Sequence, residues 1–285
     1  MTTVLVLGSS GMAGHVMTLY LEQNERLAVT NLSHKRRLNA RTVLLNVGDL
    51  DAFSRYLDEN HFDIIINCIG ILNQYADQNK STAVLMNSYL PQFLAAKYKD
   101  TDTRIIHLST DCVFSGKVGA YRESSFRDGD SFYDRSKALG ELCNDKDLTF
   151  RMSIIGPDMN PEGIGLFNWF MKQSGAVYGY KNALWNGITT IELAKAAEAA
   201  IFSGLSGLYH LVPTESISKY NLLKLCQKVF DRQDIKIIPY DNSLTDKRLI
   251  NTREDFSFTI SGYGDMISEM KVWVDTHNSL YAHYQ

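Results

Sequence analysis

Residues 4–14, VLVLGSSGMAG, decide the fold of this chain. A short apolar run over 4–7 passes directly into a turn with glycines at positions 8, 11 and 14, and an amphipathic stretch over 12–21 follows. Glycines at this spacing let backbone N–H groups and the N-terminus of the next helix approach a pyrophosphate without an intervening side chain. Because the turn lies at the first strand-to-helix junction, it predicts a dinucleotide-binding βαβ unit.

Short apolar segments continue to alternate with longer amphipathic ones up to about residue 155. The pattern predicts the following elements: strands at 28–30, 63–67, 104–109 and 149–155, and helices at 12–21, 81–98 and 132–143. The unbroken run Ile64-Ile65-Ile66 is typical of a strand covered on both faces. We therefore predict an α/β Rossmann fold with a doubly wound, mostly parallel sheet.

The rhythm loosens after Gly156 and Pro157, where glycines interrupt short aromatic-rich pieces. This change predicts a cofactor-binding Rossmann domain over 1–155 and a smaller α/β substrate-binding lobe over 156–285. The segment near 187–203 is expected to pack back on the first domain. The elements expected in the lobe are helices at 191–202 and 218–230 and strands at 208–212 and 235–238.

Composition excludes several classes of protein. The 285 residues carry 29 Lys and Arg against 32 Asp and Glu, a net charge of −3, which argues against binding to nucleic acid. No apolar run approaches the ~18 residues of a membrane span and no basic leader opens the chain, so a cytoplasmic protein without membrane attachment is expected. The cysteines form no C-x-x-C pair, and no set of side chains has metal-ligand spacing, so no metal site is predicted. A metal at a subunit contact and a homodimer are left open.

The segment after the second predicted strand bears on the choice of cofactor. Between Arg26 and Gly48 the chain has no Asp or Glu to bind an adenosine ribose, but His34, Lys35 and Arg36 follow the strand. Such donors suit a 2′-phosphate, so we expect NADPH to be preferred, with NADH possible. The alternative is that this charge run is only a solvated loop.

A second motif could carry chemistry. Tyr133 and Lys137 are four residues apart, so on a helix the phenol and the ammonium share one face. A second pair with this spacing, Tyr220 and Lys224, is interpreted as helix surface. Only the first pair follows a strand that ends in a hydroxyl residue, Thr110, where the carboxyl edge of the sheet should face the cofactor.

With these motifs in this order, the chain resembles the extended short-chain dehydrogenase/reductase superfamily and, within it, the dTDP-4-dehydrorhamnose reductases. The resemblance spans most of the chain and is strongest up to about residue 155. It is carried by the glycine turn, LSTDCVFSG at 108–116, YRE at 121–123, YDRSKALGE at 133–141, NCIG at 67–70, Asn87, and NGITT at 186–190.

The resemblance implies reduction of the 4-keto group of a nucleotide-linked 4-keto-6-deoxy hexose, in deoxysugar and surface-polysaccharide biosynthesis. Tyr133 would be the general acid, Lys137 would lower its pKa and bind the nicotinamide ribose, and Thr110 would orient the substrate carbonyl. The implied cofactor shell consists of Gly8, Ser10, Gly11, Met12, His34, Lys35, Arg36, Asp49, Leu50, Cys68, Ile69 and Gly70, with Tyr133 and Lys137. The candidate substrate contacts are Thr110, Val113, Phe114, Asn168, Trp185 and Arg248, the last in a cationic set with Lys247 and Arg253.

Three departures from the family pattern leave the particular sugar open. Asp134 replaces a usual Gly, Cys112 a common Tyr and Ile154 a frequent aromatic residue. Two alternatives remain: a sugar-nucleotide epimerase or dehydratase of the same superfamily, and a non-catalytic NADP-binding regulatory subunit. Cys112 disfavours a dehydratase, which usually has a Glu there, and the complete Thr110, Tyr133 and Lys137 set disfavours a regulatory subunit. Three histidines are expected to be structural: His15, His107 and His210.

Overall fold

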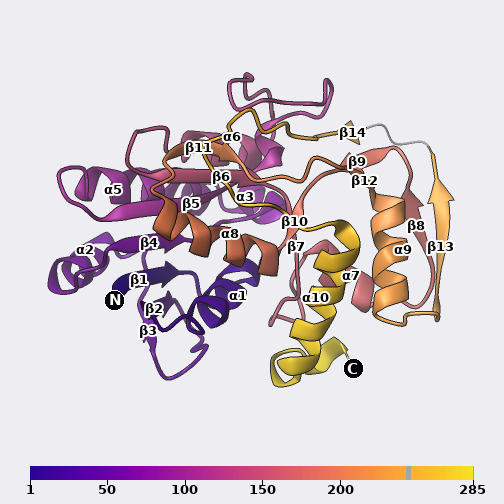
Figure 1. Ribbon diagram of the computed structural model, residues 1–285, viewed down its shortest axis with the longest axis horizontal. Helices are drawn as coiled ribbons and strands as arrows, with labels where there is room; N and C mark the ends of the chain where they lie inside the picture. Colours follow the sequence, from indigo (N-terminus) through magenta and orange to yellow (C-terminus); the bar gives the residue numbers. More distant parts are fainter. Residues whose placement is uncertain (242–244, 285) are drawn as a thin grey trace.

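The computed structural model describes residues 1–241 and 245–284, and in them seven parallel strands form one twisted sheet (Figure 1). Its order is β11-β6-β5-β4-β1-β2-β3. The bounds are β1 Thr2–Leu7, β2 Leu27–Ser33, β3 Thr42–Leu44, β4 Ile64–Asn67, β5 Arg104–Thr110, β6 Leu148–Met152 and β11 Gly207–His210. The predicted doubly wound parallel sheet is confirmed. The strand order reverses between β1 and β4, and ligands bind at such a switch point, beyond the carboxyl ends of the strands.

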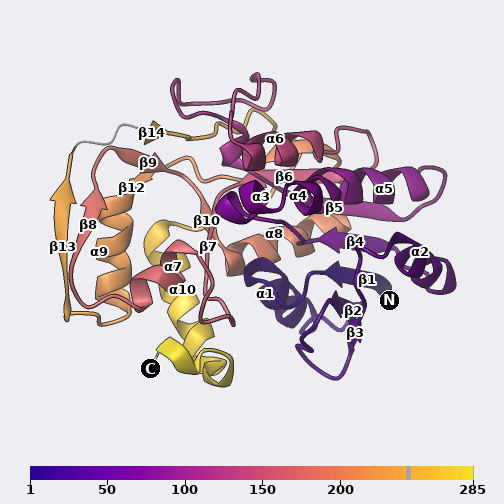
Figure 2. The same ribbon diagram turned by 180° about the vertical axis from the view of Figure 1, so that it is seen from behind.

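Helices cover both faces of the sheet because successive residues of β1 point to opposite sides. Val4 and Val6 pack with α1 (Met12–Leu21) and α8 (Thr190–Ser203). Leu5 and Leu7 pack instead with α2 (Leu50–Glu59) and α5 (Leu90–Lys97). Figure 2, seen from behind, shows α2, α5 and α6 (Phe132–Leu139) on that second face.

Some predicted helices have different bounds in the structure. The predicted helix over 81–98 consists of α4 (Lys80–Ala83), a π-helical turn η1 (Val84–Tyr89) and α5. The helix predicted over 132–143 ends at Leu139, and Gly140 follows because a Cβ there would lie 1.9 Å from the Asn87 carbonyl oxygen. Sequence patterning missed α2 and the long α10 (Tyr263–Thr276).

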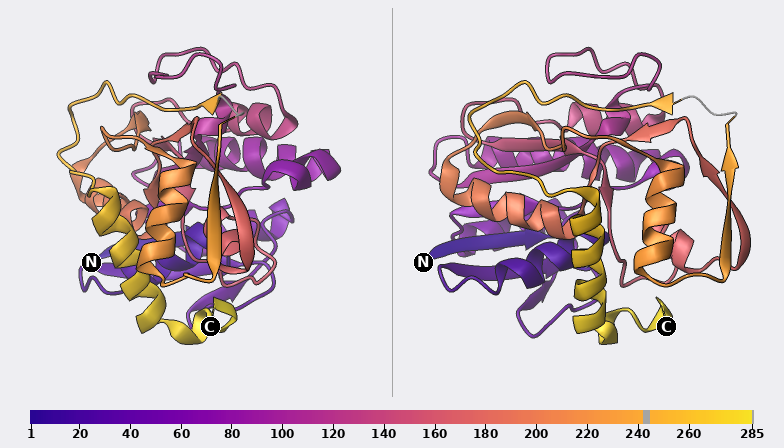
Figure 3. Two further views of the ribbon diagram at one scale, coloured as in Figure 1. Left: turned by 90° about the vertical axis from the view of Figure 1, so that its right-hand side faces the viewer. Right: turned by 45° about the vertical axis from the view of Figure 1, so that its right-hand side comes forward.

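The second half of the chain adds small sheets beside the main one (Figure 3). Among the described residues these are three small sheets: β8 (Gly175–Tyr180) with β13 (Ile235–Tyr240), β7 (Ile154–Ile155) with β10 (Ile188–Thr189), and β9 (Ala183–Trp185) with both β12 (Ile217–Ser218) and β14 (Thr245–Asp246). The remaining elements are α3 (Asn73–Gln78), η2 (Asp111–Val113), α7 (Leu166–Met171), α9 (Lys219–Val229), η3 (Asn278–Leu280) and η4 (Ala282–Tyr284).

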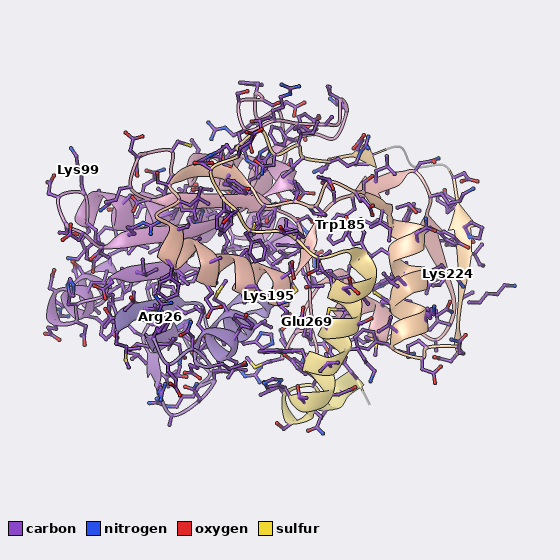
Figure 4. The ribbon with its side chains drawn as sticks, viewed as in Figure 1. Arg26, Lys99, Trp185, Lys195, Lys224 and Glu269 are labelled. Carbon is purple, nitrogen blue, oxygen red and sulfur yellow. The ribbon has the colours of Figure 1, made fainter. Side chains whose placement is uncertain are left out.

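Part of the second half belongs spatially to the first. Helix α8 lies on α1, where Asn24 donates a hydrogen bond to Glu198 (2.6 Å), and β11 completes the main sheet beside β6. Lys195 of α8 in turn binds Glu269 of α10 at 2.5 Å (Figure 4). The division at residue 155 therefore stays a prediction. Among the described residues, no helix is long and apolar enough to cross a membrane.

Candidate active site

The glycine turn between β1 and α1 has the backbone geometry that a bound pyrophosphate needs. Gly8 has φ +82°, and a Cβ on Gly14 would lie 2.1 Å from the Gly8 carbonyl oxygen. Gly11 precedes α1 and no side chain caps the helix, so the first N–H groups of α1 are left to bind an anion. The backbone approach at Gly8 and Gly14 and the uncapped helix end fit a dinucleotide.

The predicted cofactor shell is distributed over the ends of β1, β2 and β4. A Cβ on Gly8 would lie 2.9 Å from the Ile69 side chain, so the segment 68–70 directly adjoins the glycine turn. His34, Lys35 and Arg36 are exposed just after β2. The next cation, Arg37, has a structural partner, because its guanidinium donates to the Thr42 carbonyl.

Two further predicted cofactor residues lie at the start of α2. Asp49 is its N-cap, and its carboxylate accepts a hydrogen bond from the Ala52 N–H (3.1 Å). Leu50 is the first residue of the helix. This capping role gives Asp49 a structural function in addition to its predicted place in the cofactor shell.

The three predicted catalytic side chains come together at the carboxyl end of β5. Thr110 is the last residue of that strand, and Tyr133 and Lys137 share the inner face of α6, where both are buried. The Lys137 ammonium donates to the Leu108 carbonyl of β5 (2.6 Å), which fixes the helix against the strand. The Thr110 hydroxyl accepts from the Cys112 N–H (3.1 Å) and donates to Asp111 (3.2 Å).

The start of α6 explains one departure from the family pattern. Ser131 and Asp134 form a capping box, with the Ser131 hydroxyl accepting from the Asp134 N–H (3.1 Å) and the Asp134 carboxylate accepting from the Ser131 N–H (3.2 Å). Both bonds satisfy N–H groups at the end of the helix. Asp134 therefore stabilises the helix that carries Tyr133 and Lys137.

Burial shifts both titrating groups of this helix. It raises the pKa of the Tyr133 phenol above its usual 10. Burial also lowers the pKa of Lys137 to about 8, although the charge of Glu141 opposes this. Burial is therefore the main influence on the phenol, and Tyr133 is protonated at neutral pH, while the expected lowering of its pKa by Lys137 stays a prediction.

A buried ionic network connects the end of β5 with the segment after α6. The Glu141 carboxylate accepts hydrogen bonds from Ser109 (2.7 Å), from Arg127 (2.9 Å) and, through two nitrogens, from Arg151 (2.8 and 2.7 Å). Arg151 also donates to Nε2 of His210 (2.8 Å). Because Ser109 precedes Thr110 and Glu141 follows α6, the network fixes the strand and the helix relative to each other.

Most of the predicted substrate residues have structural partners. Phe114 is buried and stacks on Tyr121 at 4.1 Å between ring centroids, and Val113 lies in the same small cluster. Asn168 is also buried, and its amide donates to the Gly163 carbonyl (2.6 Å). Trp185 packs against Tyr263 between the main sheet and the α9 region (Figure 4). All four stay predictions as substrate contacts.

The three cations of the predicted set, Lys247, Arg248 and Arg253, are not equivalent. Arg248 forms an ion pair with Asp246 (2.6 Å), and Arg253 donates to the Leu208 carbonyl (3.0 Å). Lys247 instead reaches the turn that follows β5, where a Cβ on Gly116 would lie 2.9 Å from its side chain. Its pKa is raised: burial opposes the charge, but the Cys112 thiol and the Asp111 carboxylate favour it. The sequence contains no signal that separates Lys247 from its two neighbours.

The second Tyr–Lys pair lies away from this centre, whereas His107 lies beside it, with Nε2 3.5 Å from the Lys137 ammonium. Tyr220 and Lys224 are on α9, in the smaller part of the molecule (Figure 4). His107 is fully buried and adjoins Asn67 (3.2 Å), as a structural histidine would. Nowhere in the described part of the chain do three or more His, Cys, Asp or Glu side chains gather in a way that could hold a metal ion.

Comparison with known proteins finds a matching family and relatives of similar sequence. The family described as RmlD substrate binding domain matches residues 1–155. A probable low-salt glycan biosynthesis reductase of Haloferax volcanii is 29% identical over 157 residues, 53% of this chain and 52% of the relative, so the chain matches about half the length of that protein. A dTDP-4-keto-6-deoxy-D-glucose reductase of Streptomyces niveus is 26% identical over 254 residues, 83% of this chain and 82% of the relative.

Solved structures share the fold. The dTDP-4-dehydrorhamnose reductase of Bacillus anthracis, solved in complex with NADP, superposes with a TM-score of 0.80 at 17% identity, covering 96% of this chain and 100% of that one. At this identity the likeness concerns the fold alone.

Proposed function

Since the chain belongs to the RmlD substrate binding domain family, we propose that it is a reductase that uses NADPH, with NADH possible, to reduce the 4-keto group of a nucleotide-linked 4-keto-6-deoxy hexose. One observation carries the proposal: Thr110, Tyr133 and Lys137 meet at the carboxyl end of β5, in a sheet whose first turn can hold a dinucleotide. The names of the Streptomyces and Haloferax relatives, both reductases, support the reaction. The NADP bound to the Bacillus structure supports the cofactor.

The reaction adds a hydride to C4 and a proton to the C4 oxygen. NADPH, when bound at the glycine turn, supplies the hydride. Tyr133 is protonated at neutral pH and donates its phenolic proton to the oxygen. Lys137, one helical turn away, provides positive charge as the phenol loses that proton.

The other residues orient the reactants. The Thr110 hydroxyl hydrogen-bonds the carbonyl oxygen and stabilises its developing charge. Lys35 and Arg36 bind the 2′-phosphate, and the N–H groups at the start of α1 bind the pyrophosphate. We place the reaction in the cytoplasm, in the supply of deoxysugars for surface glycans, a role supported by the glycan function named for the Haloferax relative.

The test follows NADPH oxidation with a panel of nucleotide-linked 4-keto-6-deoxy hexoses, with and without an N-acetyl group. We expect one member to be reduced rapidly and Tyr133→Phe to abolish turnover. Tyr220→Phe, from the second pair with the same spacing, is the matched control and should keep full activity.

Two outcomes would contradict the proposal. Full turnover in Tyr133→Phe would refute the mechanism. No oxidation across the panel despite tight NADPH binding would favour a regulatory subunit, or an epimerase or dehydratase if oxidised cofactor copurifies with the protein.

A further inference from the structure

Three hydrogen bonds connect the C-terminal segment to the glycine turn. The indole nitrogen of Trp273, on α10, lies 3.0 Å from the Tyr281 hydroxyl. That hydroxyl lies 2.6 Å from Nε2 of His15, on α1, and Nδ1 of His15 lies 2.8 Å from the Gly11 carbonyl oxygen. His15 and Tyr281 are 0% and 1% exposed, so water does not compete for these bonds.

The direction of each bond follows from the groups themselves. An indole N–H can only donate, so the Tyr281 hydroxyl accepts from Trp273 and uses its own proton to donate to His15. Nε2 of His15 is therefore the unprotonated nitrogen, and Nδ1–H donates to the Gly11 carbonyl, which can only accept. Burial lowers the pKa of His15 to about 4, which agrees with the neutral ring that this arrangement requires.

The bond from His15 to the Gly11 carbonyl bears on the cofactor because of peptide geometry. The Gly11 carbonyl and the Met12 N–H belong to one planar trans peptide unit and point in opposite directions. The carbonyl also accepts the backbone N–H of His15 (3.1 Å), so both bonds that orient it come from one residue. Fixing the carbonyl toward the helix fixes the Met12 N–H outward from the start of α1, where the pyrophosphate is expected.

We propose that Tyr281 is a positioning residue for the cofactor, and that the C-terminal segment acts through His15 to orient the peptide that binds the pyrophosphate. The inference rests on the proposed function, which supplies NADPH as the ligand. It gives a role to a histidine and a tyrosine that are 266 residues apart and that the chemistry at C4 does not use. Without the hydroxyl, His15 loses the donor that fixes its tautomer, and its bond to Gly11 weakens.

The experiment uses Tyr281→Phe, which removes only the hydroxyl and keeps the ring that packs on His15 (5.7 Å between centroids). Dissociation constants are measured for NADPH and for adenosine 2′-phosphate, which carries the 2′-phosphate but no pyrophosphate. We expect the Kd of NADPH to rise about fivefold, as for the loss of one modest hydrogen bond, and that of adenosine 2′-phosphate to stay unchanged.

Two further variants separate this effect from general damage to packing. Tyr209→Phe, on β11, also removes a buried hydroxyl with one hydrogen bond, from Asn251 (2.6 Å), and should leave both constants unchanged. Trp273→Phe removes the indole N–H that donates to Tyr281 and keeps the bond between Tyr281 and His15. It should therefore weaken NADPH binding less than Tyr281→Phe.

An unchanged Kd of NADPH in Tyr281→Phe would overturn the inference. An equal weakening of both ligands, or the same weakening in Tyr209→Phe, would also overturn it, because a packing defect would then explain the result. Failure of the wild-type protein to bind NADPH would refute the proposed function, and this inference with it, before any variant is compared.

Discussion

Replacing Glu141 by glutamine is expected to lower the free energy of unfolding by about 3–5 kcal/mol, the usual cost of breaking a buried ion pair. The Glu141 and Arg151 side chains are 0% and 1% exposed, so the guanidinium has no access to water. The carboxylate accepts four hydrogen bonds from Ser109, Arg127 and Arg151. A glutamine keeps one accepting oxygen, turns an N–H₂ group toward the Arg151 donors and leaves that charge without its counterion.

The assay is urea denaturation monitored by circular dichroism. The slope of the free energy of unfolding against urea concentration is compared between variants. Arg127→Ala is the matched control, because this guanidinium binds the same carboxylate but is 43% exposed, and it should cost about 1 kcal/mol or less. We also expect Glu141→Gln to lower kcat, since Ser109 adjoins Thr110. If the free energy of unfolding falls in Glu141→Gln by no more than about 1 kcal/mol beyond its fall in Arg127→Ala, the argument that Glu141 balances the buried Arg151 charge is refuted.

Three other predictions follow from the same structure. Gly14→Ala places a Cβ 2.1 Å from the Gly8 carbonyl, so we expect about 1–3 kcal/mol lower stability and weaker NADPH binding; an unchanged melting temperature would contradict this. Burial lowers the pKa of His15 and His210 from 6.5 to about 4 in the folded protein. The unfolded chain therefore binds these protons first, and stability that is complete above pH 6.5 should fall toward pH 4, by about 2 kcal/mol for each histidine at pH 5; equal urea midpoints at pH 7 and pH 5 would show otherwise. Arg36→Ala should raise the Kd of NADPH about tenfold and leave that of NADH unchanged, whereas equal effects on both would support the solvated-loop interpretation.

The local pattern of the sequence sufficed to predict the parallel sheet of the Rossmann half and the position of Thr110, Tyr133 and Lys137 at its edge. The glycine turn, the strand that ends at Thr110 and the spacing of Tyr133 and Lys137 are all short-range features. A parallel sheet brings the carboxyl ends of its strands to one edge whatever the connecting loops contain, so the location of these residues at that edge follows from the local pattern, while their roles stay predictions. The predicted helix over 132–143 was wrong only at its end, since the helix ends at Leu139 and Gly140 caps it.

Contacts between distant parts of the chain could not be predicted in this way. Three neighbouring cations at 247, 248 and 253 look alike in the sequence, but only the tertiary structure directs Lys247 to the turn that follows β5, near Gly116. Likewise, nothing near His15 in the sequence indicates its hydrogen bond to Tyr281. The physical reason is that periodicity and turn chemistry depend on neighbours along the chain, whereas the partners of a buried charge or ring depend on which segments the fold brings together.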